Sequence, residues 1–126
     1  YINQPAVSVL SGGNATSFTA IDLTTNTAIP TTTLQNIIVT LLVVFTPLAA
    51  NDVVKFRPTG SSATAGLPTI TGTTAGVAQT QYLTMIAGVG SSKPEIDYLV
   101  SVSGDAVSVS VVSWTGVSNT AYPALV

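Results

Sequence analysis

The chain has 126 residues, only 6% of them charged, and it contains neither histidine nor cysteine. With a net charge of −2 and three basic residues it cannot form a surface that tracks phosphates, so nucleic-acid binding is not expected. The length predicts one domain, and a hydrophobic content of 46% is the opposite of the composition of disordered chains.

The scarcity of charge is the most informative feature of the composition. An ordinary soluble domain carries about 25% charged residues, whereas the polar positions here are mainly Thr, Ser, Asn and Gln. Such a surface is tolerable when neighbouring copies bury it or when glycans cover it. We therefore expect an extracellular or cell-surface protein whose partners are copies of itself.

The predicted elements are all strands. Val, Ile and Thr dominate, which favours strands over helices. Short β-prone segments separated by turns predict a single antiparallel β-sandwich that is jelly-roll-like. In chain order, the expected strands are Ala6–Leu10, Thr16–Leu23, Leu34–Phe45, Asp52–Arg57, Leu67–Thr71, Val77–Ala87, Glu95–Ser103 and Ala106–Trp114.

The first strand is expected to be separate from the rest. It is followed by Ser11-Gly12-Gly13, which predicts a strand and linker over residues 1–13 and a sandwich body over residues 14–126. Directly after the glycines, Asn14-Ala15-Thr16 matches the acceptor pattern for N-glycosylation. Asn14 is therefore a candidate site of glycan attachment.

The third segment, Leu34–Phe45, is apolar at nearly every position and is expected to be buried on both faces. Its longest apolar run, Ile37–Phe45, is far shorter than the roughly 20 residues that a membrane helix needs. No membrane span is expected.

Near the C-terminus, Glu95–Ser103 and Ala106–Trp114 flank the dipeptide Gly104-Asp105. This dipeptide suits a two-residue hairpin turn. The two strands are therefore predicted to pair with each other, with Val102 opposite Val107.

The residues that usually perform catalysis are missing. Without His or Cys there is no ordinary general base, thiol nucleophile or common metal ligand set. Glu95 and Asp97 share one face of a strand, but we interpret them as solvated strand-end charges beside Lys93. We expect no enzyme activity, no cofactor and no metal site.

The N-terminal segment Tyr1–Leu10 is apolar and β-prone. Such a strand either closes its own sheet or adds to the exposed edge of a neighbouring subunit, which is donor-strand complementation. Donation is a head-to-tail contact and generates an open filament. Both alternatives stay open, and Tyr122–Val126 is a second donor candidate.

In its low charge, its Thr/Ser/Val-rich body without Cys and its apolar N-terminal strand, the chain resembles the subunits of archaeal bundling pili and related biofilm-matrix fibres. The resemblance implies a jelly-roll-like sandwich, secretion through a cleaved signal and polymerisation by the N-terminal strand. Pro5 departs from a regular donor, because it cannot donate to a ladder. The matching interface residues would be Ile2, Pro5, Ala6, Val7, Val9 and Leu10.

Two alternatives compete with a filament subunit. A viral capsid subunit or capsid-decoration protein would also bury its surface in an assembly, although no basic arm is present. A carbohydrate-binding sandwich would use exposed aromatic residues, for which Tyr82 and Tyr122 are available. Tyr98 and Trp114 are expected to serve strand packing instead.

Overall fold

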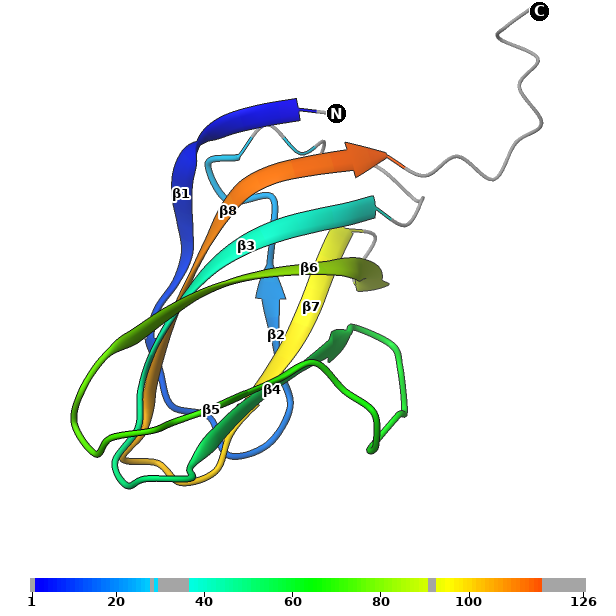
Figure 1. Ribbon diagram of the computed structural model, residues 1–126. Coiled ribbons are helices and arrows are strands. Elements are labelled where there is room, and N and C mark those ends of the chain that lie inside the picture. Colours follow the sequence, from blue (N-terminus) through cyan, green and yellow to red (C-terminus); the bar gives the residue numbers. More distant parts are fainter. Residues whose placement is uncertain (1, 28, 30–36, 91–92, 117–126) are drawn as a thin grey trace, which may run out of the picture.

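The computed structural model describes residues 2–27, 29, 37–90 and 93–116, and within these it describes residues 2–5 and 90 by their backbone alone. The described residues contain eight strands and no helix (Figure 1). The strands are β1 (Ile2–Gly13), β2 (Thr19–Asp22), β3 (Ile37–Thr46), β4 (Val53–Pro58), β5 (Thr69–Thr71), β6 (Gln79–Gly90), β7 (Lys93–Val100) and β8 (Ala106–Gly116).

All strand pairs are antiparallel, so the predicted all-β class is confirmed. The strand order is β1-β8-β3-β6-β7-β4-β5, and β2 pairs with β7. The strands form two layers (Figure 1). We call β1, β8, β3 and β6 sheet A, and β2, β7, β4 and β5 sheet B. The two are continuous, because the Gly88–Gly90 end of β6 pairs with Lys93–Glu95 of β7.

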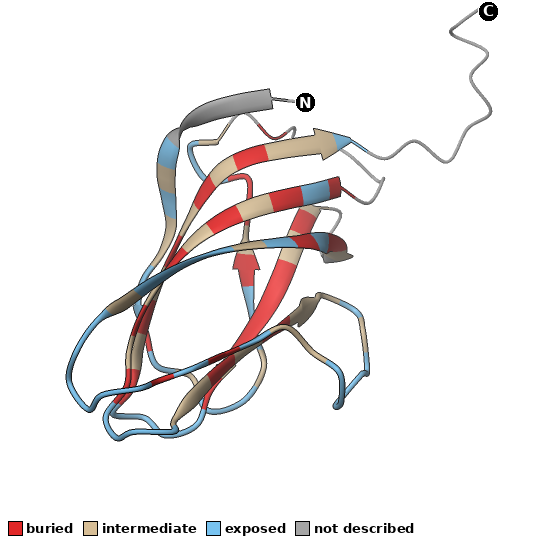
Figure 2. Cartoon of the chain, in the orientation of Figure 1, coloured by how far each residue is buried: buried red, intermediate tan, exposed pale blue. Residues whose placement is uncertain are grey.

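The core lies between the two sheets and is built mainly from alternate residues of β3, β4, β6, β7 and β8 (Figure 2). In β3, Leu41, Val43 and Phe45 are fully buried, and Phe56 of β4 and Ile96 of β7 close the core from sheet B. Burying a side chain of this size contributes roughly 1.5–3 kcal/mol. The period of two follows from the pleat, which directs successive side chains to opposite faces.

The expectation that β3 is buried on both faces is wrong. Its residues alternate between buried and partly exposed, and Ile38 is 37% exposed while Leu42 and Val44 are half-buried. The apolar residues on the second face are therefore not part of the core. Among the described residues, no further layer covers the outside of sheet A.

The predicted C-terminal hairpin is also wrong. β7 pairs with β2, β4 and β6, whereas β8 pairs with β1 and β3. The chain between them crosses from sheet B to sheet A. The buried carboxylate of Asp105 holds this corner, because it accepts hydrogen bonds from the amides of Leu48 at 2.7 Å and Val102 at 3.1 Å.

β1 does not end at Leu10 but continues through the expected linker to Gly13, paired with β8 of its own chain. The pairing is irregular, with register shifts between Asn3 and Val7, Ser8 and Leu10, and Leu10 and Gly13. The first shift spans Pro5, which cannot donate a hydrogen bond to the ladder. Gly12 has a φ of 63°, a left-handed conformation that glycine adopts without strain.

Candidate assembly surface

Charge is distributed very unevenly between the two sheets. No Lys, Arg, Asp or Glu occurs in β1, β3, β6 or β8, so sheet A carries no ionised side chain within its strands. All eight charged residues of the chain lie in sheet B or in turns: Asp22, Asp52, Lys55, Arg57, Lys93, Glu95, Asp97 and Asp105. The molecule therefore has one sheet without charged residues in its strands and one sheet with them.

The outer face of sheet A is apolar at its centre. Tyr82 is 65% exposed and Ile86 is 50% exposed. These β6 residues lie opposite Leu42 and Ile38 of β3, so the exposed side chains form a contiguous patch. Hydroxyl residues complete the face: Thr40 and Thr84, whose oxygens are 3.0 Å apart, and Ser108 and Ser110 of β8.

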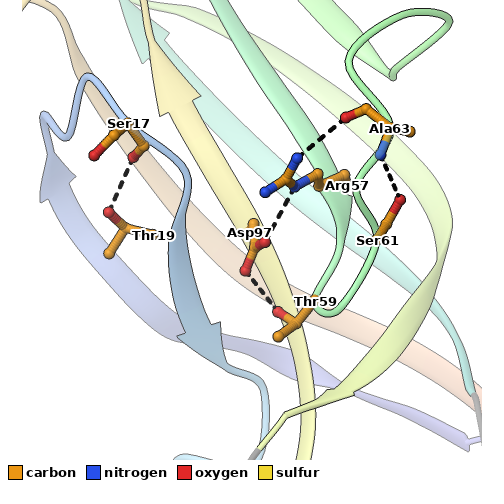
Figure 3. Close-up of polar contacts among 7 residues, drawn as sticks. All are labelled: Ser17, Thr19, Arg57, Thr59, Ser61, Ala63 and Asp97. Atoms are coloured by element: carbon orange, nitrogen blue, oxygen red, sulfur yellow. Dashed lines mark hydrogen bonds and ion pairs between the residues drawn. The ribbon is translucent and has the colours of Figure 1, made fainter.

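The outer face of sheet B carries a network of charged groups (Figure 3). Arg57 Nε donates to Asp97 at 3.2 Å, and the Thr59 hydroxyl donates to the same carboxylate at 2.8 Å. The Arg57 guanidinium also donates to the Ala63 carbonyl and lies 3.8 Å from the centroid of the Phe18 ring. Asp97 is 8% exposed, so its interpretation as a solvated charge is wrong.

At the β2 edge of this network, Lys93 Nζ lies 3.3 Å from Asp22. Burial alone would raise the pKa of Asp22, but hydrogen bonds from the Thr24 hydroxyl and amide, together with Lys93, lower it below its ordinary value. Burial raises the pKa of Glu95, and the like charges of Asp22 and Asp97 add to this effect. The ionised form of Glu95 is thus disfavoured in the folded chain.

Neither a pocket nor a group of three potential metal-binding side chains occurs among the described residues. Glu95 and Asp97 share a face, as predicted, but the Asp97 carboxylate is already engaged by Arg57 and Thr59. These hydrogen bonds hold the end of β4 against β7, so the network has a structural role.

The structure brings the predicted interface residues together on one edge of sheet A. Val7 and Leu10 lie opposite Val111 and Val109 of β8. Val9 and Leu10 pack against the core while remaining half-buried, and Ala6 is exposed. Ile2 and Pro5 lie on the same strand. Tyr1 and the second donor candidate, residues 122–126, lie outside the described residues.

The candidate glycan acceptor lies in the loop between β1 and β2. Asn14 and Thr16 are exposed. Between them, the Ala15 amide donates to the Tyr98 hydroxyl at 3.2 Å, and its carbonyl accepts from the Val100 amide at 2.9 Å. The Asn14 side chain therefore projects from a loop that is anchored on the core.

One feature of sheet A was missed by the sequence interpretation. Residues 79–87 of β6 pair with β3 on one side, and no described residue pairs with them on the other. The sequence of β6 contains no charge or proline that would mark an edge strand, so its position could only follow from the topology of the whole chain.

No family model, curated protein or solved structure matches the chain. Over the described residues, there is no helix with the length and apolar character needed to span a membrane.

Proposed function

We propose that this protein is a structural subunit that assembles with copies of itself outside the cell or at the cell surface. The segregation of charge carries the proposal. The outer face of sheet A exposes Tyr82 and Ile86 and has no ionised side chain in its strands. Exposed apolar patches mark interaction sites, and burying this one requires no desolvation of a charge.

The mode of assembly that we propose is exchange of β1 in an extracellular, pilus-like filament. β1 is an edge strand with half-buried apolar residues, and Gly12 near its end has a φ of 63°, which glycine adopts without strain. Each contact that β1 makes with β8 can be made equally with β8 of a neighbour, so exchange keeps the contact energy while it links subunits head to tail. The resemblance to pilus subunits supports the same mode.

A cysteine pair tests the exchange directly, because the natural chain has none. Ser8 and Ser110 lie opposite each other in the β1–β8 pair. Cross-strand neighbours have Cα atoms about 4.5–5.5 Å apart, which a disulfide can bridge. Oxidising assembled Ser8→Cys/Ser110→Cys protein should give a covalent ladder of multimers on a denaturing gel. A disulfide confined to single chains would contradict exchange.

Deletion of residues 1–10 gives a second test by electron microscopy. We expect the full chain to form filaments, and the truncated chain to remain soluble and to bind a peptide of residues 1–10 in trans. Filaments formed by the truncated chain would rule out strand donation.

The second candidate function is that of a viral capsid subunit or capsid-decoration protein. The order β1-β8-β3-β6 in one layer and β2-β7-β4-β5 in the other favours it. We interpret this order as a jelly roll, an architecture common in capsid proteins. Closed shells in the electron microscope, with the Ser8→Cys/Ser110→Cys disulfide formed within single chains, would support this function over the filament.

Glycan attachment at Asn14 is compatible with both forms of assembly, since the side chain is exposed. The intact mass of the protein from its native source, compared with that of an Asn14→Gln variant, tests it. Equal masses, after allowance for the substitution, would exclude a glycan at this site.

A further inference from the structure

The free edge of β6 is long and regular. Its pairing with β3 runs from Gln79 opposite Phe45 to Ala87 opposite Ile37 without a register shift. Gln81 points to the same side of the sheet as the buried Met85 and is nevertheless exposed. Among the described residues no strand pairs with this side of residues 81–87, whereas the Gln79 side chain at the start of the edge hydrogen-bonds with Thr71 and Thr73.

This edge also lacks the usual protection. Natural proteins guard sheet edges with charges, prolines, bulges or very short strands. β5 and β2 are short, with three and four residues, and β1 carries Pro5 and three register shifts. β6 has none of these devices, because its sequence is QTQYLTMIAGVG.

From this edge we infer that β6 pairs antiparallel with β6 of a second copy, about a two-fold axis at Thr84. In this register Tyr82 of each copy lies opposite Ile86 of the other. The two most exposed apolar side chains of β6 then form aromatic–β-branched pairs, a favourable cross-strand combination. The edge is thus complementary to itself.

The charge distribution favours a second copy as the occupant. Neither edge has a charge to repel its counterpart, and the pairing joins the two uncharged outer faces of sheet A into one larger surface. The pairing ends near Gly88, because the Thr59 backbone lies against that residue. It uses no residue of β1, so it is independent of strand exchange.

Single cysteines test the register. The Cα atoms of two Thr84→Cys residues would lie about 4.5–5.5 Å apart, within disulfide range. Thr80→Cys is the matched control, since both positions are exposed on the same face of β6. In the proposed register the two Thr80 Cα atoms lie about 27 Å apart, from a rise of about 3.4 Å per residue.

Upon mild oxidation of the full chain, Thr84→Cys should form covalent dimers at least about tenfold faster than Thr80→Cys, because pairing raises the effective thiol concentration. Equal rates would overturn the two-fold pairing. Cross-linking of Thr84→Cys to a Ser8→Cys chain, in preference to itself, would place β1 on this edge and would also overturn it.

A charge pair provides a second measurement that does not use disulfide chemistry. Thr84→Lys and Thr84→Glu each place like charges opposite each other at the axis, so each variant alone should lose the dimer in sedimentation experiments. An equimolar mixture should regain it, and salt should weaken the regained dimer. Dimers of either variant alone that match those of the parent would contradict the inference.

Discussion

Asp97, Asp105 and Glu95 are carboxylates in three different environments. Asp105 is 1% exposed, and its carboxylate accepts hydrogen bonds from backbone amides of two separate turns. Asp97 lies against the Arg57 guanidinium on the outer face of sheet B. Glu95 is the cross-strand partner of Asp22, so it lies beside a like charge. The carboxylates of Asp105 and Asp97 thus accept hydrogen bonds from neighbouring groups, whereas Glu95 is partly buried beside a like charge.

The environment of Glu95 leads to a prediction about pH. Burial and the neighbouring acids raise its pKa in the folded chain above the ordinary value of 4.5. A raised folded pKa contributes stability at low pH that is lost as pH rises through the folded pKa. Glu95→Gln should therefore raise the melting temperature at pH 7, and the difference from the parent should shrink below about pH 4.5. Thermal unfolding between pH 3 and pH 8 measures both.

Asp22→Asn is the matched control, with the opposite sign. The folded pKa of Asp22 is lowered below 3.8. Its contribution is present above that value and lost as pH falls through the folded pKa. Asp22→Asn should lower the melting temperature at pH 7. A lower melting temperature for Glu95→Gln at pH 7 would show that the environment of Glu95 favours its charge.

At the scale of single elements, the strands could be predicted but their partners could not. Alternating residues place β4 and β8 within a few positions of the expected segments. The same alternation cannot tell which sheet a strand joins. Val100 and Val107 face the core in the actual corner, as they would in a hairpin, whereas Val102, the predicted partner of Val107, is 39% exposed.

The candidate surface was predictable only in part. Val7, Val9 and Leu10 stand out as an apolar N-terminal segment, and the structure places them on an edge strand. The exposed face of β3 was not foreseen, because a strand with apolar residues on both faces looks the same whether a second layer or another molecule covers it. Tyr98 is buried and Trp114 packs against the core, so their predicted packing roles are confirmed.

Two adjacent leucines of β3 separate the inner face from the outer. Leu41 is fully buried between Leu83 and Val111, whereas Leu42 faces outward opposite Tyr82 and Ser110. Leu41→Ala should lower the free energy of unfolding by about 2–5 kcal/mol, because it leaves a cavity. Leu42→Ala should cost the isolated chain less than about 1 kcal/mol. Urea titration of both variants checks this, and equal losses would contradict the two-faced description of β3.

At the scale of the whole molecule, the outer faces of the two sheets differ in whether they carry charged side chains. The outer face of sheet B already contains Lys93, Glu95 and Arg57, which are all partly exposed. Arg57 is paired with Asp97 and Lys93 with Asp22. The outer face of sheet A has no charge within its strands. Assembly through sheet A leaves the charged face outward, where it maintains solubility.

A single lysine on either face tests this asymmetry. Ser110 of β8 lies between Leu42 and Ser8 on sheet A, and Ala20 of β2 is exposed opposite Asp97 on sheet B. Ser110→Lys should weaken assembly that packs this face against another copy, because a buried unpaired charge is costly. Ala20→Lys should assemble as the parent does. Light scattering and electron microscopy report both, and assembly of Ser110→Lys would exclude this face from the contact.

The pairing of β1 with β8 also sets an order of events in time. These strands lie at opposite ends of the described chain, so β1 is synthesised long before its partner exists. Sheets that depend on such distant pairings fold slowly. Until Ala106–Gly116 has been synthesised, β1 of the same chain has no β8 strand to pair with. Pairing of β1 with β8 of its own chain therefore competes with pairing to β8 of another chain at the last step of folding. A higher local concentration of newly made chains favours the pairing between chains.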